Sequence, residues 1–339
     1  MKKIQFVSCA LSLVAVSLCQ ADVFAPTYSQ PSMDRWMYPF NSTPGAELRA
    51  PLFGAIQVAS FDDRDSEMLL KFDTSADIPA GMPISHYKVV SASMKMTVST
   101  STAAVFYDPT ADAVATSYTI GDPAYIADSD PSKPIEMFGV AYRNGYNVQT
   151  FNENSAFGCQ GFPVEGCRNV YPIDVDSNGA PFDIARQVRM HLEATPWAIG
   201  MNSTLSPGDP LVAGTELTFN FDLSRPGVRA YFKQAMAAGK LMIAATSLHA
   251  ASGGPGGGTS SDYPSFHTKE GNAAAAGKLE IRVRVYEGAD YNGDGVVDFF
   301  DYLDFVDDFS AASFDADFNE DGVLDFFDYL DFVDVFAGG

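Results

Sequence analysis

The chain has 339 residues, a length that predicts about two domains and a large hydrophobic core. Lys and Arg number 21 against 43 Asp and Glu, so the formal net charge is −22. Because binding to phosphates requires a cationic surface, this charge argues against a nucleic-acid partner and favours divalent cations. Aromatic residues make up 13% of the chain, which argues against general disorder.

The first 21 residues have the pattern of a secretory signal peptide. Two lysines precede an apolar stretch over residues 4–18, and small residues come before the expected cleavage point at Asp22. Cys19 leaves a lipoprotein anchor as an alternative, although Leu18 is bulky where such anchors have a small residue. No other apolar run approaches the roughly 20 residues of a membrane-spanning helix. We therefore predict a protein that is secreted or held at the cell surface.

Residues 22–287 are expected to form one antiparallel, jelly-roll-like β-sandwich, because short apolar segments alternate with clusters of Gly, Pro, Asp and Ser. In residues 278–287 apolar and charged side chains alternate, which is typical of a strand with one buried face. The segment 22–50 is expected to pack onto this body. The expected strands are 68–74, 87–100, 103–107, 187–194, 217–223, 241–248 and 278–287.

One short helix is predicted in the body after Ser224. Ser224 or Arg225 can cap it, Pro226 suits its first turn, and Gly239 stands where it should stop. The apolar residues between these signals recur at helical spacing.

Two cysteines lie outside the signal peptide, Cys159 and Cys167. In an oxidising compartment they are expected to form one local disulfide. Their spacing matches neither a redox motif nor a zinc knuckle.

Four carboxylates crowd just before the first long strand. Two carboxylates at a defined separation can hydrolyse glycosides. A calcium ion bound by the sandwich, or a solvated turn, is the preferred interpretation, and no serine elbow, zincin helix or Cys–His signature occurs. We therefore assign no catalytic residue. The four carboxylates are Asp62, Asp63, Asp65 and Glu67.

The last fifty residues contain one motif twice. Residues 290–310 and 317–337 differ at only five of 21 positions. Each copy begins D-x-N-x-D-G-x-x-D-x-x-D, the pattern of the twelve-residue EF-hand loop with glycine at the sharp turn. The expected ligands are Asp290, Asn292, Asp294, the Val296 carbonyl, Asp298 and Asp301 in the first copy, and Asp317, Asn319, Asp321, the Val323 carbonyl, Asp325 and Asp328 in the second.

These ligand sets predict two bound Ca²⁺ ions, because they offer hard oxygen atoms and neither His nor Cys. The twelfth position is Asp, where sensor EF-hands have the longer Glu. Residues 290–339 contain fifteen acidic residues and no Lys, Arg or His. We therefore expect the tail to fold with metal and to loosen without it. The alternative is an acidic disordered tail. The thirteen aromatic residues of this segment argue against it.

The paired loops, each with Asp at position 12 and one following helix, resemble a dockerin module over residues 289–339. The resemblance implies two calcium ions and docking onto a cohesin domain of a scaffold or cell-surface protein, with the near-symmetry allowing two orientations. Positions 10 and 11 carry pairs of Phe where many cellulosomal dockerins have small hydroxyl residues. We predict that Phe299, Phe300, Phe326 and Phe327 contact the partner; in the alternative, one Phe of each pair packs between the helices.

The body resembles the DNRLRE-type carbohydrate-binding sandwich more weakly. Residues 61–81 and 89–98 look like its early strand pair, and residues 239–252, 263–271 and 278–287 fit its closing order. This resemblance implies binding of an extracellular polysaccharide or surface glycan.

The sequence as a whole predicts a signal peptide (1–21), a β-sandwich (22–287) and a dockerin-like calcium module (288–339). The predicted function is non-catalytic: the sandwich binds polysaccharide and the tail docks to a cohesin-like or surface-anchored partner. One alternative is a dockerin-bearing glycoside hydrolase or polysaccharide lyase. Another is a structural surface protein whose tail associates with itself in a calcium-dependent way.

Overall fold

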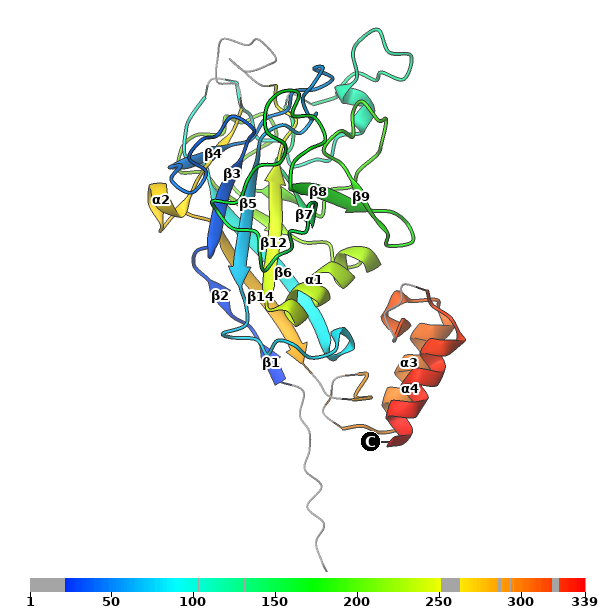
Figure 1. Ribbon diagram of the computed structural model, residues 1–339. Coiled ribbons are helices and arrows are strands. Elements are labelled where there is room, and N and C mark those ends of the chain that lie inside the picture. Colours follow the sequence, from blue (N-terminus) through cyan, green and yellow to red (C-terminus); the bar gives the residue numbers. More distant parts are fainter. Residues whose placement is uncertain are drawn as a thin grey trace, which may run out of the picture.

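The computed structural model describes residues 22–102, 104–130, 132–250, 263–285, 288–292, 294, 296–318 and 323–338. The predicted signal peptide lies outside these residues, as do Asn319 and Asp321 of the second calcium loop. Figure 1 shows a β-rich body followed by two neighbouring helices at the C-terminal end.

Most of the body belongs to one antiparallel sheet of twelve strands. Its main order is β1-β14-β6-β11-β10-β7-β12-β5-β3, with β2 paired to β14, and β8 joining β7 to β9. A two-stranded sheet joins β13 to β4. The strands are β1 (Asp22–Phe24), β2 (Thr27–Tyr28), β3 (Met33–Met37), β4 (Arg49–Pro51), β5 (Glu67–Asp73), β6 (Tyr87–Thr97), β7 (Glu136–Tyr142), β8 (Val170–Val175), β9 (Pro181–Asp183), β10 (Ala198–Met201), β11 (Glu216–Asn220), β12 (Lys240–Thr246), β13 (Ser265–His267) and β14 (Lys278–Val285).

The large sheet curls so that its two halves share one hydrophobic core. Leu279 and Ile281 on β14 belong to the same buried cluster as Leu70 on β5 and Ile243 on β12. Burial of one apolar face per strand is the main source of stability in such a packing. The prediction of a mainly β, antiparallel, sandwich-like body is therefore confirmed.

The helices are few and short. Those of the body are η1 (Ile84–His86), η2 (Val114–Ser117), α1 (Pro226–Ala238) and α2 (Lys269–Asn272). The predicted helix is α1: Arg225 is its N-cap, Pro226 occupies its first turn, and Gly239 ends it with a φ of 70°. This left-handed conformation suits glycine because a Cβ would clash there. Within the described residues, no helix is long and apolar enough to cross a membrane.

The outer face of the sheet around β5, β7 and β12 carries a second hydrophobic cluster. Leu69 and Met242 lie in it, and Phe151 covers them from the long β7–β8 connection. Lys71 on β5 is also buried on this face, where its Nζ donates to the Phe151 carbonyl at 2.6 Å. Central strands are thus buried on both faces, which explains their nearly continuous apolar sequence.

Two expected strands are absent from the structure. Residues 187–194 form turns, with His191 at a φ of 51°, and residues 104–107 contribute only a bridge from Phe106 to Pro210. Conversely, β7, β8 and β10 were not expected, although β7 pairs with β12 in the middle of the sheet. β7 also carries Gly139, whose missing side chain admits the buried Trp197 ring.

The tail consists of α3 (Phe299–Ser310), η3 (Phe314–Ala316) and α4 (Phe326–Gly338). α3 and α4 lie side by side (Figure 1) and enclose a small aromatic core of their own. Each helix begins at position 10 of its predicted calcium loop, as a loop-and-helix repeat requires.

Candidate functional site

The first predicted calcium loop folds around the carboxylate of Asp301. Its Oδ1 accepts from the backbone N–H of Asn292 at 3.0 Å and its Oδ2 accepts from that of Asp298 at 2.8 Å. Asp290 Oδ1 accepts from the Asp294 N–H at 3.1 Å, and Asp294 Oδ1 accepts from the Val296 N–H at 2.9 Å. The loop therefore turns its expected oxygen ligands inward, around position 12.

The second predicted loop repeats the part of this geometry that the structure describes. Asp328 Oδ2 accepts from the Asp325 N–H at 2.8 Å, the same distance as in the first loop. Asp325 Oδ1 accepts from the Phe327 N–H, as Asp298 Oδ1 does from that of Phe300. Of the remaining expected ligands of this loop, Asp317 and Val323 are described, and Asn319 and Asp321 lie outside the described residues.

The donor set fits a divalent cation. Asp301 and Asp328 are 0% exposed and Asp290 is 4% exposed, yet the tail sequence contains no basic side chain to neutralise them. Buried carboxylates are costly unless they are paired or bind a metal. Asp and Asn side chains and a carbonyl are the ligands that Ca²⁺ prefers. The residue types of these loops therefore fit a calcium ion.

The two repeats meet at equivalent residues. Phe305 and Phe332, which are 27 positions apart, stack with ring centroids 4.0 Å apart, and the hydroxyls of Tyr302 and Tyr329 are 3.1 Å apart. Contacts between equivalent residues are typical of two-fold symmetry. The tail is therefore nearly symmetric about an axis between α3 and α4.

The four phenylalanines at loop positions 10 and 11 are exposed. Phe299, Phe300, Phe326 and Phe327 have between 62% and 64% of their surface accessible to solvent. The alternative in which one Phe of each pair packs between the helices is therefore wrong: Phe305 and Phe332 fill that place. Exposed large apolar side chains in equivalent positions are a candidate partner surface.

Asp62 and Glu67, considered above for glycoside hydrolysis, are buried in the body. Arg168 lies between them, with its Nε 2.9 Å from Asp62 Oδ2 and its Nη1 2.6 Å from Glu67 Oε1. All three side chains are at most 1% exposed. A sugar cannot reach this pair, and an arginine occupies the position that a cation would need. The interpretation as a solvated turn or a body calcium site is therefore wrong here.

The neighbouring charges extend this buried network. Arg64 is paired with Glu136 at 2.7 Å and donates to Gln187 at 2.8 Å. Asp63 accepts from the backbone N–H of Arg189 at 2.9 Å. Gln187 and Arg189 lie in the segment that was expected to be a strand, so these polar contacts explain why it forms turns instead.

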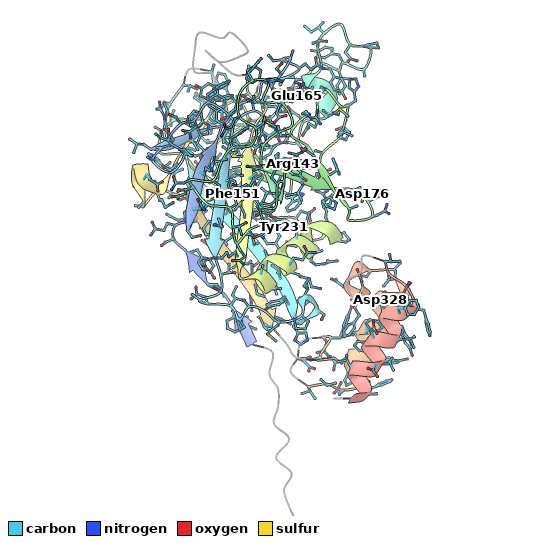
Figure 2. All side chains as sticks on the ribbon, in the orientation of Figure 1. Arg143, Phe151, Glu165, Asp176, Tyr231 and Asp328 are labelled. Atoms are coloured by element: carbon cyan, nitrogen blue, oxygen red, sulfur yellow. A yellow bond between two sulfur atoms is a disulfide. The ribbon has the colours of Figure 1, made fainter. Side chains whose placement is uncertain are left out.

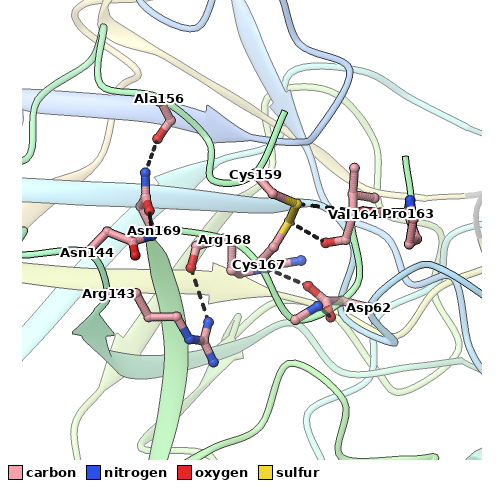
Figure 3. The surroundings of a disulfide bond; sticks show 11 residues. Asp62, Arg143, Asn144, Ala156, Cys159, Pro163, Val164, Cys167, Arg168 and Asn169 are labelled. Carbon is pink, nitrogen blue, oxygen red and sulfur yellow. Dashed lines mark hydrogen bonds and ion pairs between the residues drawn. A yellow bond between two sulfur atoms is a disulfide. The ribbon is translucent and has the colours of Figure 1, made fainter. Parts of the chain in front are cut away.

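The predicted pair Cys159 and Cys167 forms a disulfide beside the network (Figure 3). Cys167 directly precedes Arg168, and the Gly166 N–H donates to Asp62 Oδ1 at 2.8 Å. The disulfide therefore closes the loop that delivers Arg168 to its carboxylates.

The two tryptophans of the chain could offer flat rings for stacking on a sugar. Trp197 is fully buried, and its Nε1 donates to Asp174 at 2.9 Å, so its ring cannot stack on a sugar. Trp36 is half-buried and stacks on Tyr38.

A groove of about 580 Å³ runs between α1 and the outer face of the sheet. Tyr231 on α1 (Figure 2) donates to the Met242 carbonyl of β12 at 2.6 Å, which fixes the helix across the sheet. Tyr142 and Tyr146 also line the groove, and Gln234 adds a polar group. No sequence signal pointed to this groove, because its walls come from four separate segments.

An ion pair joins the body to the tail. Arg229 on α1 lies with its Nε 2.8 Å from Asp315 Oδ1, directly before the second calcium loop.

The buried network predicts a pH-dependent stability. Burial raises the pKa of Glu67 to about 7, although Arg168 opposes this shift. The folded state therefore binds the Glu67 proton more tightly than the unfolded state, in which the pKa is near 4. The stability that this gives is fully present below pH 4 and is lost as the pH rises to 7. We expect the Glu67 contribution to the free energy of unfolding to fall by on the order of 3 kcal/mol between these pH values.

Glu67→Gln should remove this decrease in the free energy of unfolding when urea unfolding is measured from pH 4 to pH 8. Glu216→Gln, at an exposed position on β11, is the matched control and should follow the native curve. Identical slopes for Glu67→Gln and the native protein would contradict the interpretation.

Comparison with protein-family models and with curated proteins finds no match for this chain.

Proposed function

We propose that this protein is an exported attachment protein. In this proposal the C-terminal module is dockerin-like, binds two Ca²⁺ ions through EF-hand-type loops, and docks to a cohesin-like or surface-anchored partner. A jelly-roll-like body binds an extracellular polysaccharide or surface glycan. The observation that carries the proposal is the set of four exposed phenylalanines at equivalent positions, each pair following a position-9 Asp in a loop with the calcium-binding sequence pattern.

An apolar docking surface accounts for the placement of these phenylalanines. Exposure of hydrophobic side chains to water costs free energy, so four exposed phenylalanines indicate a surface that a partner covers. Aromatic residues are enriched at the centres of protein interfaces. Each pair belongs to one half of a nearly symmetric module, so either half offers the same surface. The module would therefore accept its partner in either of two orientations.

Calcium enters the proposal as the neutralising ion of the tail. Two Ca²⁺ ions supply four positive charges to a segment of fifteen carboxylates. They would also bind the loop oxygens directly before the phenylalanines, and so fix the angle at which α3 and α4 present them.

The calcium ligands can be tested by calorimetry on the full chain. Asp290→Ala with Asp317→Ala should lower the number of bound Ca²⁺ ions by two, because position 1 of each loop is lost. The matched control is Asp304→Ala with Asp331→Ala, which removes the same charge from exposed, equivalent sites on α3 and α4. Calcium binding that is unchanged by the loop variant, or lost equally in the control, would refute the assignment.

The docking surface can be tested by binding of the full chain to the surface fraction of the cells that export it. Phe300→Ser with Phe327→Ser should weaken calcium-dependent binding at least about tenfold, the loss expected for central aromatic contacts. Each single variant should retain most binding, because the other half remains. The control Ile120→Ser changes an apolar body residue that is 84% exposed. Undiminished binding of the double variant would exclude this surface.

The groove beside α1 is the proposed glycan site. Its tyrosines offer flat apolar faces for sugar rings, and Asn147, Gln234 and Lys240 offer polar groups for hydroxyls. Asp62 and Glu67, the carboxylates considered for the hydrolase alternative, are paired with Arg168 in the interior.

Ala230 is an exposed residue of α1 that lines the groove. Ala230→Trp should block the groove and abolish binding on a glycan array, while Val90→Trp, at an exposed site on β6, should not. Binding that survives the Ala230 substitution would place the glycan elsewhere. Calcium-dependent oligomerisation without any glycan binding would select the structural surface protein instead.

A further inference from the structure

The long connection between β6 and β7 brings a second group of carboxylates together in the body. It leaves the sheet after Thr97, projects at the top of the view in Figure 1, and returns at Glu136. Asp108 and Asp112 stand near its beginning and Asp130 near its end. Each of the three places one carboxylate oxygen within 4.8 Å of those of the other two.

The carboxylate of Asp108 is the buried member of this group. Asp108 is only 4% exposed, and its Oδ1 accepts from both the N–H and the hydroxyl of Thr110, at 2.9 and 2.7 Å. The same hydroxyl lies 3.0 Å from Asp130 Oδ2. Thr110 therefore holds the two carboxylates close together, although a hydroxyl cannot neutralise their charges.

Two oxygens of this group have no partner among the described residues. Asp108 Oδ2 and Asp130 Oδ1 are inaccessible to solvent and accept no hydrogen bond. An unsatisfied buried carboxylate oxygen costs free energy, more than a neutral polar atom does. Burial raises the pKa of Asp108, and the nearby Asp130 carboxylate adds to this effect.

The local cation does not compensate for this charge. Lys133 is bound to Asp112 Oδ2 at 2.7 Å and to Asp128 Oδ2 at 2.6 Å, so one ammonium group serves two carboxylates. Within the described residues, Asp108 and Asp130 form no ion pair with a basic side chain, and one oxygen of each has no hydrogen-bond partner.

We infer that Asp108, Asp112 and Asp130 form a divalent-cation site in the body, and that the ion is Ca²⁺. Three carboxylates supply hard oxygen ligands, and no nitrogen or sulfur ligand takes part. A site at a loop, with positions left for water, suits the variable coordination of Ca²⁺ better than the strict octahedron of Mg²⁺. The ion would join residues 108–112 to residues 128–133 and so close the base of the projecting connection.

The other acidic group of the body does not offer such a site. Asp34, Glu153 and Glu270 also approach one another, but the ammonium group of Lys269 lies among all three. The two groups differ in how far a lysine compensates them. Lys269 pairs with all three carboxylates of the first group, whereas among the described residues Lys133 pairs with Asp112 alone in the second.

The test uses the full chain with both tail loops disabled by Asp290→Ala and Asp317→Ala, so that only the body site remains. Calorimetry with CaCl₂ should detect one ion with a dissociation constant on the order of 0.1–1 mM, the range of extracellular calcium modules. Saturating Ca²⁺ should also raise the thermal midpoint of the body. Adding Asp108→Asn with Asp130→Asn should abolish both effects. Absence of any ion in the tail-disabled protein would overturn the inference.

Two further variants keep the test decisive if the Asn substitutions impair folding. Asp112→Asn changes a half-buried ligand and should weaken calcium binding at least about tenfold, as expected for loss of one charged ligand. Glu216→Gln, an exposed carboxylate on β11, should leave binding unchanged. Calcium binding that is insensitive to Asp112→Asn would also overturn the inference. None of these outcomes depends on the tail, so the proposal of a body site and the proposal of a docking module are tested separately.

Discussion

Dense negative charge is the constraint on which the tail depends. Fifteen carboxylates share fifty residues with no basic side chain, and the aromatic core that joins α3 to α4 is small. At close range like charges repel one another, and burial of the position-12 carboxylates adds a desolvation cost. In the proposed account, two calcium ions offset both effects. The ions then become part of the fold, and the display of the phenylalanines becomes dependent on them.

In the body, buried carboxylates are paired with arginine. Arg168 enters the interior and pairs with Asp62 and Glu67, which precede and begin β5. Arg64 pairs with Glu136 at the start of β7. Buried ion pairs add little net stability, but removing one partner leaves a costly charge behind. The disulfide next to Arg168 holds this arrangement in place. At Asp108 and Asp130, which form no ion pair with a basic side chain among the described residues, the proposed cation would take the same role.

The sequence predicted those features that depend on local patterns. Alternation in residues 278–287, the signals around α1 and the duplicated loops all concern neighbours in the chain, and the fold class follows from them. It did not predict β7, because that strand is buried on both faces and shows no alternation. Residues 187–194 alternate like a strand, but their polar side chains bind Arg64 and Asp63 from a distant segment. The ion pair between Asp62 and Arg168 could not be predicted for the same reason, since the two residues lie 106 positions apart in the sequence.

Amide hydrogen exchange of the full chain, with calcium and then with a chelator, tests the central claim most directly. If calcium builds the tail, amides of α3 and α4 should exchange at least about tenfold faster in the chelator, because their opening free energy falls by at least about 1.4 kcal/mol. Amides of β12 and β14 should keep their protection. Equal protection of α3 and α4 in both conditions would show that the tail holds together without metal.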